Sequence, residues 1–179
     1  MGSRESGEAD RMISLFTRDF GLISGCASAI RKEKSKMRYA LTSYARAEIS
    51  LIRGKRNWRV AGAKSLQPAT GDPKVVAAFA RISELVTRLV AGEEANAYLY
   101  SALSDAQSAF MQKNCDAAGT IELICVARVL YALGYISAEA LNTALFTHTA
   151  YAYVHLEEAE AMRGRLLSSI NHAIAQTQL

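Results

Sequence analysis

Two clusters of basic residues have the clearest capacity for chemistry in this chain. The first lies in the stretch IRKEKSKMRYAL (residues 30–41) and contains Arg31, Lys32, Lys34, Lys36 and Arg38. The second lies in LIRGKRNWR (residues 51–59) and contains Arg53, Lys55, Arg56 and Arg59. Clustered cations can neutralise successive phosphates of a nucleic-acid backbone and release its counterions. For each cluster, a solvated charged loop is the alternative interpretation.

Aromatic residues next to these cations could add base stacking, which needs an exposed ring among positive charges. Trp58 is the only tryptophan of the chain and lies between Arg56 and Arg59. It is either such a stacking ring or a core residue of the fold. For Tyr39 and Tyr44, core packing is the favoured interpretation.

No catalytic set can be assembled from the remaining residues. The chain has no GxxxxGK phosphate-binding loop and no nucleophile elbow, so we expect a non-enzymatic protein without a cofactor. His148 and His155 are seven residues apart, which predicts one helix face and a separation of about 10 Å. Helical ligands of one metal ion usually stand four residues apart, so no metal site is expected. Cys115 and Cys125 are expected to be small core residues.

Charge is distributed unevenly over the 179 residues. Residues 1–67 hold 14 lysines and arginines against 6 acidic residues, whereas residues 68–179 hold 7 against 11. A basic part beside an acidic part indicates nucleic acid as the partner of the first. Three cysteines without a CxxC pair fit a reducing compartment. With no long apolar run and no signal-peptide core, we expect a cytoplasmic protein with no membrane partner.

The pattern of apolar residues predicts an α+β multidomain protein. Strands are predicted over residues 11–17, 22–30, 43–52 and 57–66, with Gly21 at a turn that needs positive φ. Four strands with small residues at possible bends favour a small closed barrel, and on a basic chain this suggests an OB-fold. We therefore expect an OB-like β-barrel over 1–67, a proline-containing linker over 68–73 and an all-α helical domain over 74–179.

Helix boundaries in the second part follow from capping residues. A helix from Pro73 is expected to have Asp72 as its N-cap and to be closed by Gly92. The other predicted boundaries are Asp116 and Gly134 for a third helix. Ser137 is then expected to cap an alanine-rich stretch of one long helix or two shorter ones, with Gly164 as the break.

Three segments of the first part resemble the RecO family of bacterial recombination mediators and DNA repair proteins. They are GEADRMISLFTRDFGLI (residues 7–23), KSKMRYAL (34–41) and EISLIRGK (48–55), and IELICVARVLYALGY (121–135) is similar to a family helix that ends in Leu-Gly-Tyr. The resemblance implies an N-terminal OB-fold joined to a helical domain. It also implies binding of single- and double-stranded DNA, strand annealing, and help in loading RecA, with RecR, onto DNA coated by single-strand binding protein (SSB). Such a protein would work at the bacterial nucleoid.

The chain departs from the family pattern at two places. Family members have a strand before the Gly-Glu motif, where this chain has only MGSRES, so the first strand is expected to be missing or truncated. Many members also carry a four-cysteine zinc motif after the Gly-Tyr, which this sequence lacks. Arg128 matches a position near the docking site of the acidic SSB C-terminal tail. The resemblance therefore implies a tail-binding arginine, with a lone surface arginine as the alternative.

Two other functions fit the same residues. One is a general OB module that binds single-stranded nucleic acid and shares only the barrel with the family. The other is a helical adaptor protein without DNA binding. Strand annealing would separate the first from a recombination mediator, and absence of DNA binding at low salt would favour the second.

Overall fold

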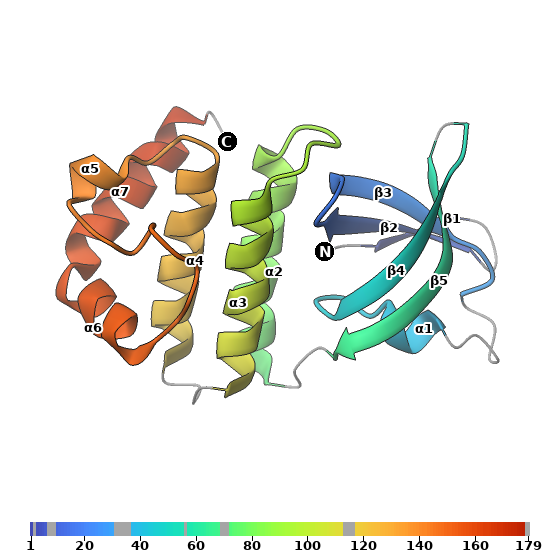
Figure 1. Ribbon diagram of the computed structural model, residues 1–179, viewed down its shortest axis with the longest axis horizontal. Coiled ribbons are helices and arrows are strands. Elements are labelled where there is room, and N and C mark those ends of the chain that lie inside the picture. The colour runs from blue at the N-terminus through green and yellow to red at the C-terminus, as the bar shows by residue number, and fades with distance from the viewer. Residues whose placement is uncertain are drawn as a thin grey trace. The chain divides into compact units, whose positions relative to one another are not determined.

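The computed structural model describes residues 1, 3–6, 10–30, 37–55, 57–68, 72–112 and 117–177, with residues 3–6 described by their backbone alone. The chain divides into two compact units (Figure 1). The first unit comprises Met1–Gly71 together with Gly92–Ala95, and the second comprises Asp72–Ala91 with Asn96–Leu179. The short segment Gly92–Ala95 follows one helix of the second unit but belongs to the first.

A five-stranded sheet with the order β1-β2-β3-β5-β4 forms the first unit. Its strands are β1 (Ser3–Ser6), β2 (Asp10–Thr17), β3 (Gly21–Ala27), β4 (Arg46–Arg53) and β5 (Trp58–Gln67). Neighbouring strands are antiparallel except for the parallel pair β3 and β5. The four predicted strands are thus confirmed, and five strands with a crossover correspond to the OB type of sheet.

The sheet is open, so the expectation of a closed barrel is wrong. Closure requires the two edge strands to pair with each other. Within the described residues β1 pairs only with β2, and β4 pairs only with β5. The first strand was expected to be either missing or truncated, and the structure shows that it is present. It is four residues long and pairs antiparallel with β2, with Ser3 opposite Ile13.

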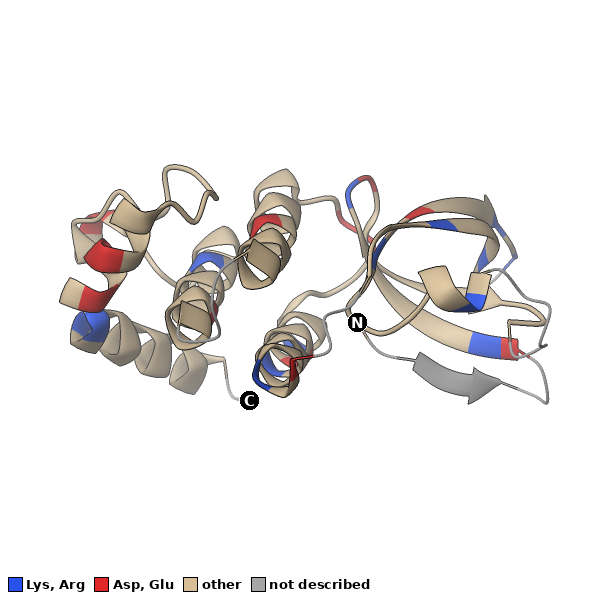
Figure 2. Ribbon diagram, turned by 90° about the horizontal axis from the view of Figure 1, so that it is seen from below, with Lys and Arg blue, Asp and Glu red and all other residues tan. Residues whose placement is uncertain are grey.

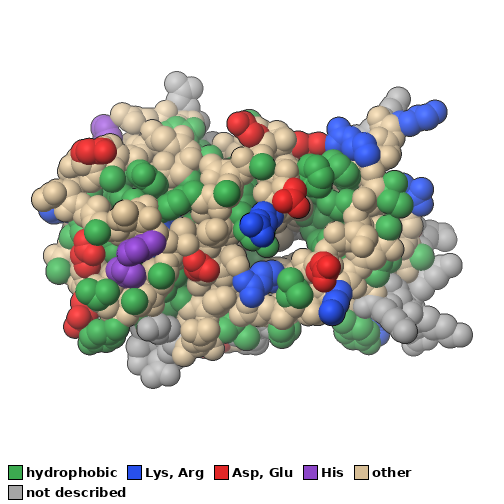
Figure 3. All heavy atoms as spheres, viewed as in Figure 1, with side chains coloured by type: hydrophobic (Ala, Val, Ile, Leu, Met, Phe, Trp, Pro, Cys, Tyr) green, Lys and Arg blue, Asp and Glu red, His purple; other side chains and the backbone are tan. Residues whose placement is uncertain are grey.

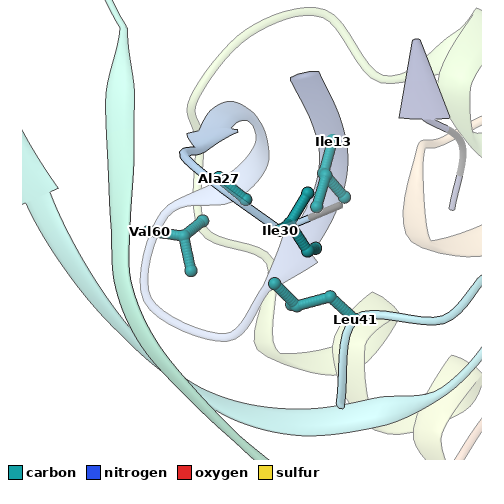
Figure 4. Packing of buried hydrophobic residues seen from close by; sticks show 5 residues of the cluster. All are labelled: Ile13, Ala27, Ile30, Leu41 and Val60. Atoms are coloured by element: carbon teal, nitrogen blue, oxygen red, sulfur yellow. The ribbon is translucent and has the colours of Figure 1, made fainter. Parts of the chain in front are cut away.

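The core of the first unit is a small cluster of aliphatic side chains that point toward one another (Figure 4). Its buried members are Ile13, Ala27, Ile30, Leu41 and Val60. Two of them, Ile30 and Leu41, lie outside the strands. Leu41 directly follows the short helix α1 (Met37–Ala40), which the sequence pattern did not predict. The helix is therefore anchored to the sheet by the residue after it.

Gly21 occupies the turn between β2 and β3 with φ +64°, which confirms the positive angle expected there. It also has a second role that only the structure shows. A Cβ at this position would lie 2.0 Å from the backbone oxygen of Glu94. The segment Gly92–Ala95 can pack against the turn only because residue 21 has no side chain.

In the described residues, the second unit consists of six helices, and α4 is the central one. They are α2 (Pro73–Leu89), α3 (Ala97–Gln112), α4 (Ala118–Ala132), α5 (Ala138–Leu141), α6 (Tyr153–Ala161) and α7 (Arg163–Gln176). Helix α4 contacts α2, α3, α6 and α7 and is buried around most of its circumference. This explains why its sequence, LICVARVLYA, has no clear polar face.

Several predicted helix boundaries are confirmed. The Asp72 carboxylate accepts hydrogen bonds from the first backbone amides of α2, and Ser137 caps α5 in the same way. Helix α4 ends in a Schellman motif at Gly134, whose φ is +80°. Gly92, by contrast, does not close α2, because that helix already ends at Leu89. Asp116 lies outside the described residues.

The alanine-rich stretch after Ser137 is not one long helix. It forms three helices, and the first of them stops at Asn142, which adopts a left-handed conformation with φ +48°. Residues 143–152 then run without a regular helix to α6. The later break falls at Met162, and Gly164 lies inside α7, so the predicted break at Gly164 is wrong.

Candidate nucleic-acid interface

The basic segment at residues 31–36 lies outside the described residues, but the chain is anchored to the sheet shortly before and shortly after it. On one side, the backbone amide of Ala29 donates a hydrogen bond to the Asp10 carboxylate at 2.8 Å, and Ile30 is buried in the core cluster. On the other side, Leu41 is buried in the same cluster. The sequence places Arg31, Lys32, Lys34 and Lys36 between these anchors.

Three of the predicted cations in the described part of the chain have exposed side chains that remain candidates for phosphate contacts: Arg38, Lys55 and Arg59. Arg38 lies on α1, whereas Lys55 and Arg59 lie at the end of the hairpin formed by β4 and β5. In Figure 3, cationic side chains project from the region where Figure 1 shows this hairpin. Arg56 of the same cluster lies outside the described residues.

Arg53, also a predicted phosphate contact, already has an anionic partner. Its guanidinium forms a salt bridge with the carboxylate of Glu93, in the segment Gly92–Ala95 of the same unit. The hydrogen bond from Arg53 lowers the pKa of Glu93 below its ordinary value. A phosphate would have to compete with this carboxylate for the guanidinium.

Trp58 is a core residue, and its proposed role as a stacking ring is wrong. The side chain is only 8% exposed. Its ring packs against Phe20 with 4.7 Å between the ring centroids, and the Arg53 guanidinium lies over it, also 4.7 Å from its centroid. An unpaired base could not reach a ring covered in this way. The sequence left both interpretations of Trp58 open, because Phe20, which covers its ring, is distant from it in sequence.

Tyr39 was expected in the core, but it is exposed. Among the described residues of the first unit, it has the most exposed aromatic ring. Its side chain is 67% exposed. Arg38 donates a hydrogen bond to the Tyr39 hydroxyl at 2.7 Å, and its guanidinium lies 4.7 Å from the centre of the Tyr39 ring. Tyr44 is partly buried and has a φ of +65°. No sequence signal separates Tyr39 from Trp58, because both rings lie beside clustered cations.

Arg128 is completely buried in α4, with 0% exposure, which contradicts both interpretations drawn from the sequence. Its guanidinium donates hydrogen bonds to the backbone carbonyls of Leu145, Thr149 and Ala150 at 2.9, 2.8 and 3.0 Å. It also lies 4.6 Å from the centre of the Tyr151 ring. The arginine therefore holds the irregular segment 143–152 in place, and it cannot bind the carboxylate of an SSB tail.

Side chains next to Arg128 are buried with it. Cys125, one turn before it, is fully buried as predicted, and burial raises the pKa of its thiol to about 12. Burial also raises the pKa of the Tyr151 hydroxyl well above its ordinary value. Both groups are held in their neutral forms, so Arg128 is the charged group of this cluster. Cys115 lies outside the described residues.

His148 and His155 do not share a helix face, because His148 lies in the irregular segment 143–152 and His155 lies in α6. Their rings are in contact all the same, with 4.4 Å between the centroids instead of the predicted 10 Å. Nδ1 of His155 lies 3.0 Å from the carbonyl of Ala150, which Arg128 also contacts. Burial and the neighbouring His148 lower the pKa of His155.

The three glutamates of α6, coloured red in Figure 2, add no third ligand to this histidine pair. The Glu158 carboxylate accepts a hydrogen bond from the Thr143 hydroxyl at 2.6 Å, and Glu160 accepts one from Arg163 at 2.7 Å. Across the described residues, no group of three histidine, cysteine or acidic side chains could hold a metal ion. The described helices also include none long and apolar enough to cross a membrane.

Comparison with known proteins matches the first unit of the chain. A family model described as "Recombination protein O N terminal" matches residues 1–68. The DNA repair protein RecO of Dehalococcoides mccartyi is 48% identical over 61 residues, which cover 34% of this chain and 24% of that protein. The protein of the same name from Desulfitobacterium hafniense is 43% identical over 53 residues, covering 30% and 19%. That of Heliobacterium modesticaldum is 32% identical over 90 residues, covering 49% and 33%.

The fold defines an α+β protein in which an OB-like sheet unit is followed by a unit of helices. The comparisons identify that sheet unit further. Residues 1–68 match the family model of the RecO N-terminal part, and the relatives that share this similarity are named DNA repair protein RecO. The chain matches a third or less of the length of these three relatives.

Proposed function

We propose that this chain is a non-enzymatic DNA-binding protein of recombination and repair. The observation that carries the proposal is the match of its sheet unit to relatives named DNA repair protein RecO. The charge of the chain supports it, because the basic surplus lies in residues 1–67. The exposed side chains of Arg38, Lys55 and Arg59 lie in the same unit. Cations of this kind bind the phosphate backbone without reading the sequence of the bases.

In this proposal, Arg31, Lys32, Lys34 and Lys36 bind successive phosphates, and Arg56 extends the contact from the hairpin. The fixed neighbours of the basic segment support the proposal. Ile30, which precedes the segment, and Leu41, which follows it, are both buried in the core cluster of the sheet unit. Arg53 contributes less, because Glu93 already neutralises its charge.

The finer steps follow the family. The sheet unit would bind single- and double-stranded DNA and anneal complementary strands. The helical unit would recruit RecR and the SSB C-terminal tail, so that RecA is loaded onto SSB-coated DNA at the bacterial nucleoid. Arg128 takes no direct part in the tail contact, since its guanidinium is buried and bonded to three carbonyls. No cofactor is required.

Fluorescence anisotropy of a labelled oligonucleotide over a salt series tests the proposal. Each phosphate contact to a single strand contributes about 0.7 to the slope of log affinity against log salt. Changing Arg31, Lys32, Lys34 and Lys36 to alanine should therefore reduce the slope by about 3. Absence of binding by the wild type at low salt would refute the proposal and favour an adaptor role for the helices.

A matched pair of double variants provides the control. Lys55→Ala with Arg59→Ala removes two exposed cations from the sheet unit, and Lys74→Ala with Arg88→Ala removes two from the helical unit. Only the first pair should reduce the salt slope. Annealing of complementary strands by the wild type then separates a recombination mediator from a simple coating of single strands, which would hinder pairing.

A further inference from the structure

Helix α1 is a short element with one buried side and one exposed side. Its single turn is closed by a hydrogen bond of 3.0 Å from the Leu41 amide to the Met37 carbonyl. Ala40 and Leu41 are buried, and Met37 packs against the core cluster. These contacts hold the backbone of α1 on the sheet, and the side chains of Arg38 and Tyr39 are left exposed.

Arg38 and Tyr39 restrain each other on the exposed side. The hydrogen bond from Arg38 to the tyrosine hydroxyl is 2.7 Å long, and the guanidinium lies over the ring at 4.7 Å from its centre. With the guanidinium in this position, Tyr39 is still 67% exposed. The ring therefore has one side against a cation while most of its surface is open to solvent.

An exposed ring beside a cation matches the chemistry of an unpaired nucleobase. Bases stack on aromatic side chains whatever their identity, and the arginine adds a cation–π contribution and attraction for a neighbouring phosphate. A base inside a duplex has both faces covered by its neighbours, so it cannot use such a ring. A phosphate contact alone does not detect an unpaired base, because both forms of nucleic acid have a negatively charged phosphate backbone.

We propose that Arg38 and Tyr39 form a stacking site for one unpaired base of a single-stranded nucleic acid. The proposal rests on the proposed function, because it requires that the sheet unit binds nucleic acid. It adds a residue that separates single strands from duplexes. It also places in Tyr39 the stacking role that the buried Trp58 cannot perform.

The test compares two labelled strands with the same number of phosphates, a thymidine oligonucleotide and its abasic analogue. Wild type should bind the strand with bases about tenfold more tightly, the effect typical of one stacked base. Tyr39→Ala should abolish this preference and leave the affinity for the abasic strand unchanged. Tyr39→Phe, which keeps the ring, should retain most of the preference.

Leu66→Ala is the matched control, because Leu66 is an exposed apolar side chain of the same unit at 55% exposure. It should leave the preference unchanged. If Tyr39→Ala weakens binding to both strands equally, or to neither, the stacking site is refuted. If wild type binds both strands equally, the stacking site is refuted while DNA binding stands. If wild type binds neither strand at low salt, the proposed function itself fails and the stacking site fails with it.

Discussion

Replacing Arg128 with methionine should destabilise the helical unit by about 4 kcal/mol. A hydrogen bond from a charged donor contributes about 1.5–3 kcal/mol, and the buried guanidinium donates three of them to the carbonyls of segment 143–152. Three bonds at the lower end of this range give about 4.5 kcal/mol, which we round down to about 4 kcal/mol. The lower end is appropriate because removing a buried cation also removes the cost of its desolvation.

Methionine is a suitable replacement because it is unbranched and fills much of the space of the arginine stem. The change therefore tests the hydrogen bonds more than the packing. Urea unfolding followed by far-ultraviolet circular dichroism measures the effect, since this signal comes mainly from the helices. A loss of about 4 kcal/mol is a large part of the total stability of an ordinary domain, which is about 5–15 kcal/mol.

Arg81→Met is the matched control. Arg81 is an exposed cation of α2 that makes two hydrogen bonds to Glu122, at 2.6 and 2.7 Å. An exposed ion pair contributes only about 0–1 kcal/mol, so this variant should unfold close to the wild type. If Arg128→Met costs no more than the control, the reasoning is refuted. The three carbonyls would then reach water without the guanidinium, and Arg128 would not hold the segment.

Three further predictions follow from single contacts. Gly21→Ala should destabilise the sheet unit by about 2 kcal/mol or more, because φ is +64° and the new Cβ would lie 2.0 Å from a backbone oxygen. Gly62→Ala is the control, because its new Cβ would lie 3.7 Å from the nearest atom, and it should cost less than about 1 kcal/mol. Thermal unfolding measures both variants, and equal melting temperatures for Gly21→Ala and Gly62→Ala would contradict the prediction. Glu93→Gln should release Arg53 and steepen the salt dependence of DNA binding by about 0.7–0.9, whereas an unchanged slope would show that Arg53 does not reach a phosphate. The pKa of His155 is lowered in the folded protein, so the unfolded chain binds a proton at this histidine more readily. The free energy of unfolding should therefore be highest above pH 6.5 and should decrease as the pH falls from 6.5 to the pKa of the folded state. His155→Asn should flatten this part of the profile of unfolding free energy against pH, and an equally steep profile in the variant would assign the effect to another group.

Features that depend on neighbours in sequence were predictable. The strands β2, β3, β4 and β5 follow from local alternation and turn residues. The caps at Asp72 and Ser137 follow from side chains that reach backbone amides two or three residues away. The glycine at position 21 was predictable as a turn residue, because positive φ is a local requirement. The contact of that glycine with Glu94 was not, since it joins distant segments.

Trp58 and Arg128 owe their environment to distant parts of the chain. Trp58 resembled an exposed ring because cations surround it in sequence, yet Phe20 and Arg53 cover it in the folded unit. Tyr39 has the same kind of sequence neighbours and remains exposed, because the buried side of α1 is provided by other residues. Sequence spacing cannot distinguish these two cases, since burial depends on which elements pack together.

The sequence by itself determined the four longer strands, the change from strands to helices, the basic character of the first unit and the resemblance of residues 1–68 to the RecO family. Tertiary structure decided which of the candidate side chains are accessible. Arg128 shows the physical reason most clearly. A lone arginine in an apolar helix is ambiguous in sequence, and its role became defined only when segment 143–152 brought three carbonyls to its guanidinium. A buried cation needs such partners, and these partners come from a segment that no local pattern connects to α4.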